Sequence, residues 1–294
     1  MRCLVIGRSG QVATALVERA AAHTGPSAAD VVALGRPDLD LCRPESIAAA
    51  ISRVEPDVVV NAAAYTAVDQ AESEPEAAAA LNAAGPAALA GLCAAADIPL
   101  VHLSTDYVFD GTLDRPYRED DPIAPASVYG RTKAEGEAAV MAAGGRALVL
   151  RTAWVYSPFG KNFVKTMLRL GAERDRLRVV SDQVGNPTSA LDIADAVLRL
   201  AAMRDGWGSG GEILHLAGTG ETSWHGLAEA IFAGTAAPPV VEPIPTSAYP
   251  TPARRPANSR LDTTRLAERY GIVLPPWRES LAVTLDRLAG AAPR

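Results

Sequence analysis

Short apolar runs alternate with alanine-rich stretches through the first half of the chain. Each run is almost continuously hydrophobic, which is typical of a strand covered on both faces. The predicted strands are Cys3–Ile6, Val31–Leu34, Val58–Asn61, Leu100–Ser104 and Leu148–Arg151. The predicted helices between them are Gln11–Ala22, Ser46–Val54, Glu76–Ala96 and Tyr129–Ala142. This alternation predicts an α/β fold with a doubly wound parallel sheet.

The pattern loosens after about residue 155. Short strands are predicted at Val179–Val180 and Ile213–Leu216, and a helix at Leu191–Met203. The proline-dense stretch Pro238–Pro256 is expected to be irregular, because proline cannot donate to a strand ladder. We therefore expect a nucleotide-binding domain at residues 1–154 and mainly a smaller C-terminal substrate lobe at 155–294, with 178–203 returning to the first domain.

Composition removes several classes of function. Charged residues make up 21% and hydrophobic residues 48%, with a net charge of −6, as in an ordinary globular chain. No basic tract is present, which argues against a nucleic-acid partner. No apolar run approaches the roughly 20 residues that cross a bilayer, so no membrane partner is expected.

The cysteines and histidines point to a reducing compartment and to no metal site. The three cysteines are widely spaced without a C-x-x-C motif, and the four histidines have no ligand spacing. Arg2 leads directly into the first predicted strand, so no signal peptide is expected. These features predict a cytoplasmic protein.

A glycine turn follows the first strand and opens the first helix. Gly7 allows a tight turn, Gly10 lets backbone N–H groups approach a pyrophosphate, and Ala13 permits close helix–strand packing. The turn predicts a Rossmann-type dinucleotide site; the alternative is a plain structural turn.

The end of the second strand bears on the choice of cofactor. Arg36 stands where an acidic residue would bind a free ribose hydroxyl, so NADPH is favoured and NADH stays possible. Arg36 as a solvated loop cation is the alternative. Asp40 and Leu41 are placed to bracket the adenine, and the small residues after Asn61 let a cofactor lie against the backbone.

The most informative stretch is Tyr129-Gly-Arg-Thr-Lys133. Tyrosine and lysine at i and i+4 share one helix face, and the ammonium is expected to lower the phenol pKa. Thr105, at the end of the fourth strand, can hydrogen-bond the carbonyl oxygen that Tyr129 protonates. An isolated Y-x-x-x-K would more often be a surface pair, but here it follows a glycine turn and a Ser-Thr strand end.

With these motifs in place, the chain resembles the extended short-chain dehydrogenases/reductases, and within them the dTDP-4-dehydrorhamnose reductase family. The likeness runs almost end to end. It rests on the segments Asn61–Asp69, Ala71–Pro75, Ser104–Phe109, Val128–Lys133, Arg151–Tyr156, Asn162–Met167, Asp182–Thr188, Pro245–Pro252 and Arg255–Leu261.

The resemblance implies the rest of the site. The cofactor would be contacted by Gly7, Gly10, Gln11, Val12, Arg36, Asp40, Leu41, Ala63, Ala64, Tyr65, Thr66, Leu103, Tyr129 and Lys133. The dTDP-sugar would be contacted by Thr105, Asp106, Trp154, Arg255, Asn258 and Ser259. Trp154 as a packing residue is the alternative.

The resemblance also implies the reaction, reduction of the C4 ketone of dTDP-4-dehydro-β-L-rhamnose by NADPH. Some family members are dimers linked by Mg²⁺ through glutamates. Ala15 and Leu191 stand at two of those positions, so no metal ligand is assigned and Mg²⁺ is doubtful; a monomer or a homodimer is expected.

Three other functions share the fold. Sugar-nucleotide dehydratases place Asp-Glu after the strand-end threonine, whereas Asp106 is followed by Tyr107, which disfavours dehydration. An epimerase would retain its cofactor. A regulatory subunit of the methionine adenosyltransferase type would bind NADP without turning over a sugar, and the intact Tyr129, Lys133 and Thr105 argue against that.

Overall fold

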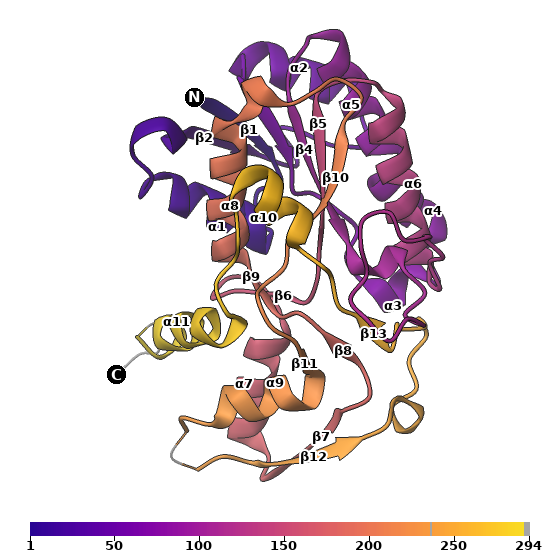
Figure 1. Ribbon diagram of the computed structural model, residues 1–294, viewed down its shortest axis with the longest axis vertical. Coiled ribbons are helices and arrows are strands. Elements are labelled where there is room, and N and C mark those ends of the chain that lie inside the picture. The colour runs from indigo at the N-terminus through magenta and orange to yellow at the C-terminus, as the bar shows by residue number, and fades with distance from the viewer. Residues whose placement is uncertain (236, 291–294) are drawn as a thin grey trace.

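The computed structural model describes residues 1–235 and 237–290 and has two lobes, one above the other in Figure 1. The upper lobe contains a six-stranded parallel sheet in the order β10-β5-β4-β3-β1-β2. Its strands are β1 (Arg2–Ile6), β2 (Asp30–Leu34), β3 (Val58–Asn61), β4 (Leu100–Thr105), β5 (Ala147–Thr152) and β10 (Glu212–His215). The doubly wound parallel sheet predicted from the sequence is confirmed.

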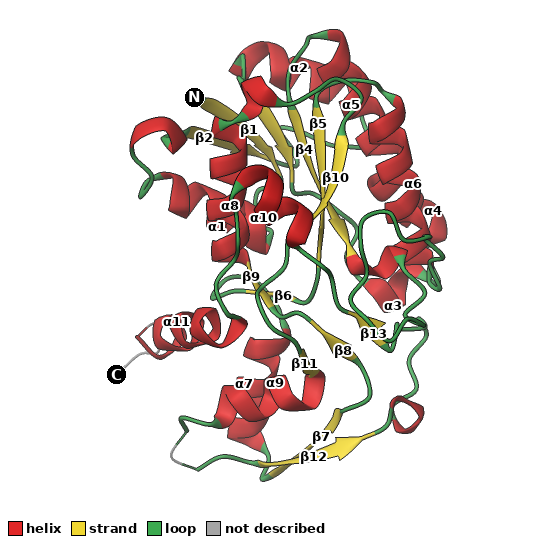
Figure 2. Cartoon of the chain, viewed as in Figure 1, coloured by secondary structure: helices red, strands yellow, loops and turns green. Residues whose placement is uncertain are grey.

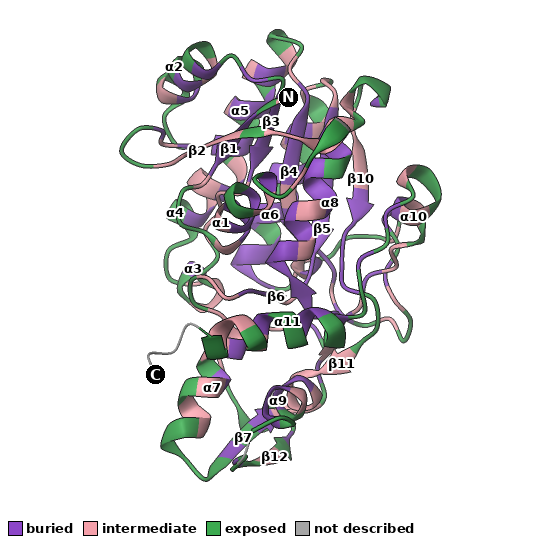
Figure 3. Ribbon diagram, turned by 90° about the vertical axis from the view of Figure 1, so that its left-hand side faces the viewer, coloured by how far each residue is buried: buried purple, intermediate pink, exposed green. Residues whose placement is uncertain are grey.

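Helices cover both faces of this sheet, as Figure 2 shows. Helices α1 (Gln11–Ala20) and α8 (Ala190–Ala202) share one apolar cluster with Cys3 and Val5. Helices α2 (Pro44–Val54), α5 (Gly85–Ala95) and α6 (Val128–Ala142) share another with Leu4 and Ile6. Because alternate side chains of β1 enter opposite clusters, the strand is apolar throughout, and Figure 3 shows the sheet buried between its helices.

The helix predicted at Glu76–Ala96 is interrupted. It begins as α4 (Pro75–Ala79), passes through a π-helical turn at Ala80–Ala84 and continues as α5. By length and composition the whole stretch Pro75–Ala95 is apolar enough to cross a membrane, so the expectation that no stretch approaches that length is wrong. In the structure α5 packs against α2 and α6 and buries Leu89, Ala90 and Cys93.

The lower lobe contains small sheets and short helices. Parallel β7 (Arg176–Val180) and β12 (Val240–Ile244) form one pair, and β11 (Thr222–Ser223), β8 (Val184–Gly185) and β13 (Asn258–Ser259) form a three-stranded sheet. Other helices and strands, in the lower lobe or between the lobes, are α3 (Val68–Ala71), β6 (Val155–Tyr156), α7 (Phe163–Glu173), β9 (Thr188–Ser189), α9 (Trp224–Phe232), α10 (Thr264–Tyr270) and α11 (Trp277–Gly290). Helices α7, α9 and α11 pack around a third apolar cluster that includes Tyr156 and Trp277.

The second half departs from the expectations in two places, once fully and once in part. The proline-dense stretch is not irregular throughout, because Val240–Ile244 forms strand β12, where Pro243 lies opposite Val179 in a two-stranded sheet that needs no donor from it. Of the segment 178–203 that was expected to return to the first domain, the part that forms α8 does so. β7 stays in the lower lobe, whereas α8 packs on α1 and β10 extends the main sheet beside β5.

Candidate active site

The glycine turn lies where the winding of the sheet reverses, between β1 and β3. Gly7 adopts φ +127°, and a Cβ there would lie 3.4 Å from the Ala13 Cβ and from the Ala62 carbonyl oxygen. A Cβ on Gly10 would meet only the Ala62 oxygen, at 4.0 Å, so the turn is open on the side of the α1 N-terminus. This geometry fits a pyrophosphate, which binds to free N–H groups at a helix N-terminus.

Two arginines flank the end of β2. Arg36 is exposed, which fits both a ligand of the ribose phosphate and a solvated loop cation. Arg8, which was not among the predicted residues, packs against Gly35 and forms an ion pair with Asp38 (Nη1–Oδ2 3.5 Å). Its place inside the glycine turn is the signal that could have identified it. Of the two residues expected at the adenine, Asp40 accepts a hydrogen bond from the Cys42 amide and Leu41 is buried.

The loop after β3 is held in place by two asparagines. Asn61 Oδ1 accepts a hydrogen bond from the Ala63 amide (3.2 Å), and Asn82 Oδ1 accepts one from the Tyr65 amide (2.8 Å). Asn82 lies in the π-helical turn, and its Nδ2 also donates to Thr132 of α6. The π-helical turn therefore links the expected cofactor loop (Ala63–Thr66) to the helix that carries Tyr129.

Helix α6 begins with caps that fix its first turn. Ser127 Oγ accepts a hydrogen bond from the Gly130 amide (3.1 Å), and the Glu72 carboxylate accepts one from the Val128 amide (2.8 Å). Tyr129 and Lys133 are both buried on one face, and Lys133 Nζ donates to the Leu103 carbonyl oxygen (2.6 Å). The tyrosine, the lysine and the end of β4 are thus brought together as the sequence predicted.

The expected effect of Lys133 on Tyr129 is not what the structure produces. Burial raises the pKa of Tyr129 to about 12, partly offset by the Thr105 side chain. Burial also lowers the pKa of Lys133 to about 8, opposed by the negative charge of Glu137. The expectation of a lowered phenol pKa is therefore wrong, because burial of the phenolate dominates and the contact with Thr105 offsets only part of it. A raised pKa keeps Tyr129 protonated, as a proton donor must be.

Thr105 and Asp106 are buried polar residues beside Tyr129. Thr105 Oγ1 donates to Asp106 Oδ1 (2.9 Å), whereas the buried Asp106 Oδ2 has no hydrogen-bond partner. Burial raises the pKa of Asp106 to about 7, although the neighbouring hydroxyls of Thr105 and Ser259 favour the carboxylate. An unpartnered buried carboxylate oxygen is costly, and it is explained if a polar ligand group contacts it.

Trp154 lies where the chain passes from the upper to the lower lobe. It has φ +47°, its Nε1 donates to Ser259 Oγ (3.0 Å), and its ring stacks on Trp224 with 3.5 Å between centroids. A Cβ on Gly185 would lie 2.6 Å from both the indole and Ser259 Oγ. Trp154 therefore packs tightly on one face, as the packing alternative holds, and its indole is hydrogen-bonded to Ser259.

The side chains of Arg255 and Asn258 are hydrogen-bonded to other parts of the protein. Arg255 binds Asp69 through both terminal nitrogens (3.0 and 2.7 Å) and so connects the 245–261 segment to α3. Asn258 Nδ2 donates to the carbonyl oxygens of Leu113 and Arg115 (both 2.8 Å), and its Oδ1 accepts from Arg260. Of the three predicted nucleotide contacts in this segment, Ser259 alone lies beside Asp106.

Gln11 connects the nucleotide turn to the lower lobe. Its Oε1 accepts hydrogen bonds from Ser157 Oγ (2.8 Å) and Asn162 Nδ2 (2.9 Å). Val12 is buried in the cluster beneath the turn. The side chains of both residues are thus used in packing and bracing, which leaves their backbone at the helix N-terminus for a ligand.

The described residues contain no group of three or more His, Cys, Asp or Glu side chains able to hold a metal ion. Ala15 and Leu191, at the positions that resemble the family's metal ligands, are both buried in the apolar cluster between α1 and α8. Neither carries a donor atom, so these positions do not fit Mg²⁺.

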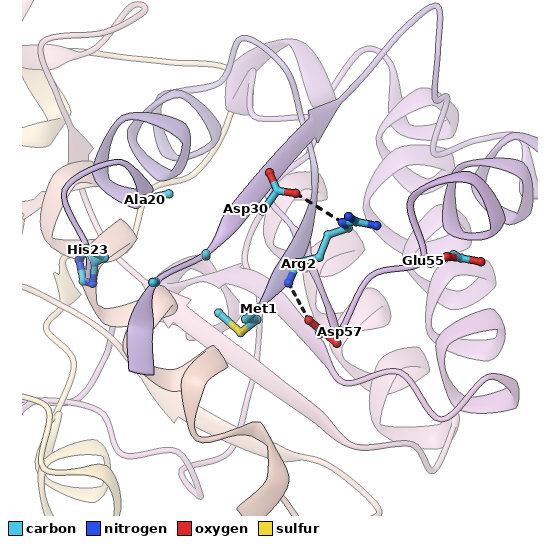
Figure 4. Close-up of a pocket in the computed structure, with 9 residues that line it drawn as sticks. Met1, Arg2, Ala20, His23, Asp30, Glu55 and Asp57 are labelled. Atoms are coloured by element: carbon cyan, nitrogen blue, oxygen red, sulfur yellow. Dashed lines mark hydrogen bonds and ion pairs between the residues drawn. The ribbon is translucent and has the colours of Figure 1, made fainter. Parts of the chain in front are cut away.

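An open hollow of about 620 Å³ lies at the opposite end of the sheet (Figure 4). Met1, Arg2, Asp30 and Asp57 line it, at the amino ends of β1 and β2 and just before β3. Ligands of open α/β sheets bind beyond the carboxyl ends of the strands, so this hollow is not the site.

A nucleotide turn at the switch point of a parallel sheet, two strands away from a buried tyrosine–lysine helix turn, places the chain among the extended short-chain dehydrogenases/reductases. The family model described as the RmlD substrate binding domain matches residues 1–289, and the chain belongs to that family.

Several relatives that match this chain over almost its whole length share one name. A dTDP-4-dehydrorhamnose reductase of Sinorhizobium fredii is 48% identical over 286 residues, covering 95% of each chain. The crystal structure of a dTDP-4-dehydrorhamnose reductase from Clostridium acetobutylicum matches with a TM-score of 0.91 and 37% identity, covering 98% of this chain and 100% of that one. Another from Bacillus anthracis, in complex with NADP, matches with a TM-score of 0.88 and 31% identity, covering 97% and 99%.

Proposed function

We propose that the protein reduces the C4 ketone of dTDP-4-dehydro-β-L-rhamnose to dTDP-β-L-rhamnose with NADPH, the last step of dTDP-L-rhamnose synthesis. The observation that carries the proposal is the buried set of Thr105, Tyr129 and Lys133 beside the open glycine turn. Family membership supports the substrate, since a relative at 48% identity is named dTDP-4-dehydrorhamnose reductase.

The chain's own residues orient the ketone and supply the proton. When the substrate binds, the Thr105 hydroxyl turns its hydrogen from Asp106 Oδ1 to the C4 oxygen, which fixes the carbonyl in front of Tyr129. The Tyr129 hydroxyl, kept protonated by burial, transfers its proton to that oxygen as negative charge develops there. The Lys133 ammonium, held by the Leu103 carbonyl, offsets the phenolate that remains. NADPH, when bound, supplies the hydride.

The residues present fit this cofactor. The N-terminus of α1 receives the pyrophosphate at the open turn, and Arg36, with Arg8 next to it, binds the 2′-phosphate. Lys133 holds the nicotinamide ribose. The NADP complex of the Bacillus anthracis relative supports this choice of dinucleotide.

The sugar nucleotide lies across the boundary between the lobes. The unpartnered Asp106 Oδ2 accepts a hydrogen bond from a sugar hydroxyl, with Trp154 and Ser259 beside it. Arg255 reaches the nucleotide phosphates when it exchanges Asp69 for them, while Asn258 supports the loop. We place the enzyme in the cytoplasm, as a monomer or homodimer.

The test is NADPH oxidation at 340 nm with dTDP-4-dehydro-β-L-rhamnose, with the product sugar identified by NMR. The expected product is dTDP-β-L-rhamnose, and Tyr129→Phe is expected to lower kcat by about 10²- to 10⁴-fold. Glu135→Gln, a change at an exposed position on the same helix, serves as a control. NADPH binding without oxidation would favour a regulatory subunit. Near-normal turnover by Tyr129→Phe would show that Tyr129 is not the proton donor.

A further inference from the structure

The face of α6 that carries Tyr129 and Lys133 continues for another turn to Glu137. The three residues follow at intervals of four, so they lie along one line of the helix. Lys133 and Glu137 are each only 2% exposed. Buried carboxylates need partners, and those of Glu137 come from the main sheet.

Glu137 binds two neighbouring strand ends at once. Ser104 Oγ donates to its Oε1 (2.5 Å), and Arg151 donates through Nε (3.0 Å) and Nη2 (2.7 Å). Ser104 of β4 and Arg151 of β5 are direct neighbours in the sheet register. Ser104 lies between Leu103, whose carbonyl holds Lys133, and Thr105, so this cluster is one residue from both.

The charges around Lys133 are few and alternate in sign. Glu137 on α6 is the anion that acts on it, and Arg151 on β5 is the cation that shares this anion. His102 on β4 is buried, hydrogen-bonded to Asn61, and kept neutral by burial and by Lys133, which hold its pKa well below the ordinary value. Tyr129, on the preceding turn of α6, is neutral because of its raised pKa.

We propose that Glu137 is a positioning residue of the active site, which holds the Lys133 ammonium charged and in place, and that Arg151 tunes this effect by sharing the carboxylate. The inference rests on the proposed function, in which Lys133 acts as a cation. It makes the Glu137–Arg151 pair the element that sets the upper pH limit of the enzyme.

The geometry predicts that substitutions of Glu137 and Arg151 shift the pH dependence of activity in opposite directions. Glu137→Gln removes the anion and leaves Arg151 cationic, so Lys133 loses its proton more easily. Arg151→Met leaves Ser104 as the remaining hydrogen-bond partner of the carboxylate, so its negative charge acts on Lys133 without the competing cation and Lys133 holds its proton more firmly. Because the ammonium is present below its pKa and lost above it, the first change moves the alkaline limb of activity to lower pH and the second to higher pH. A purely structural role would lower stability in both variants without opposite shifts.

The experiment measures kcat/KM from pH 6 to 10 and, separately, NADPH binding by fluorescence over the same range. The wild-type limb is expected near pH 8, as the Lys133 pKa of about 8 implies. Glu137→Gln is expected to move it down, and Arg151→Met up, by about one pH unit each. Arg146→Met, which breaks the exposed pair with Asp97, is the matched control and should not move it.

One more variant separates the effect of charge from that of side-chain length. Glu137→Asp keeps the charge and is expected to lower kcat while leaving the limb in place. If Glu137→Gln does not fold, the upward shift of Arg151→Met relative to Arg146→Met decides the question. Limbs that coincide in Arg151→Met and Arg146→Met would overturn the proposal. A wild type that binds NADPH but does not oxidise it would instead overturn the proposed function, and the binding titration would still report on Lys133.

Discussion

Gly136 provides a direct test of the close packing between α6 and the π-helical turn. A Cβ at this position would lie 2.1 Å from the carbonyl oxygen of Asn82, in the π-helical turn. An ordinary contact needs well over 3 Å, so Gly136→Ala must move α6 or the π-helical turn by about 1 Å. Overpacking of this kind costs about 1–3 kcal/mol of stability. A displacement of that size at a catalytic helix lowers activity by up to about 10²-fold.

The control for this change is Gly91→Ala on the adjacent helix α5. Gly91 is exposed, and a Cβ there meets nothing within 4 Å. Alanine in a helix interior is more stable than glycine by about 0.5–1 kcal/mol, so this variant should gain stability and keep its activity. Urea unfolding followed by circular dichroism, together with kcat/KM, measures both effects. If Gly136→Ala were as stable and as active as Gly91→Ala, the close contact between α6 and the π-helical turn would be refuted.

Three further predictions concern the ends of the site. Arg36→Ala is expected to raise KM for NADPH about tenfold or more and leave KM for NADH unchanged, since only NADPH has a 2′-phosphate; equal effects on both would contradict the assignment. The Asp106 pKa of about 7 exceeds its value in the unfolded chain, so between about pH 4 and 7 the wild-type protein loses stability as the pH rises. Asp106→Asn lacks this carboxyl group, so its stability relative to wild type should rise across the same window, by at most roughly 1.4 kcal/mol per pH unit. Calorimetry at pH 5 and 8 checks this. Gly185→Ala, with its Cβ 2.6 Å from Trp154 and Ser259, should raise KM for the sugar nucleotide more than KM for NADPH.

The sequence predicts the first half of the fold well because its strands are buried on both faces. Cys3–Ile6 and Val58–Asn61 match β1 and β3 to within a residue at each end. The strand-end motifs also meet as predicted, since the carboxyl ends of parallel strands share one edge. Tyr129 and Thr105 are therefore adjacent in the structure, as their positions along the chain imply.

Other features depend on packing that local sequence does not reveal. Val240–Ile244 becomes a strand because β7 pairs with it, despite Pro243. The interruption of the long helix at Ala80–Ala84 follows from where Asn82 meets α6, which no hydrophobic period signals. The direction of the Tyr129 pKa shift reflects burial, which the i, i+4 spacing with Lys133 cannot indicate.

The placement of the cations explains how a chain of net charge −6 binds two anions. Arg255 is neutralised by Asp69, so a sugar-nucleotide phosphate that takes its place exchanges one ion pair for another and gains little from charge. At the adenosine end Arg36 is exposed, and the α1 N-terminus carries free N–H groups with a partial positive charge. With the ligands placed as proposed, electrostatic attraction acts mainly on the cofactor, whereas the sugar nucleotide depends on shape and hydrogen bonds at Asp106.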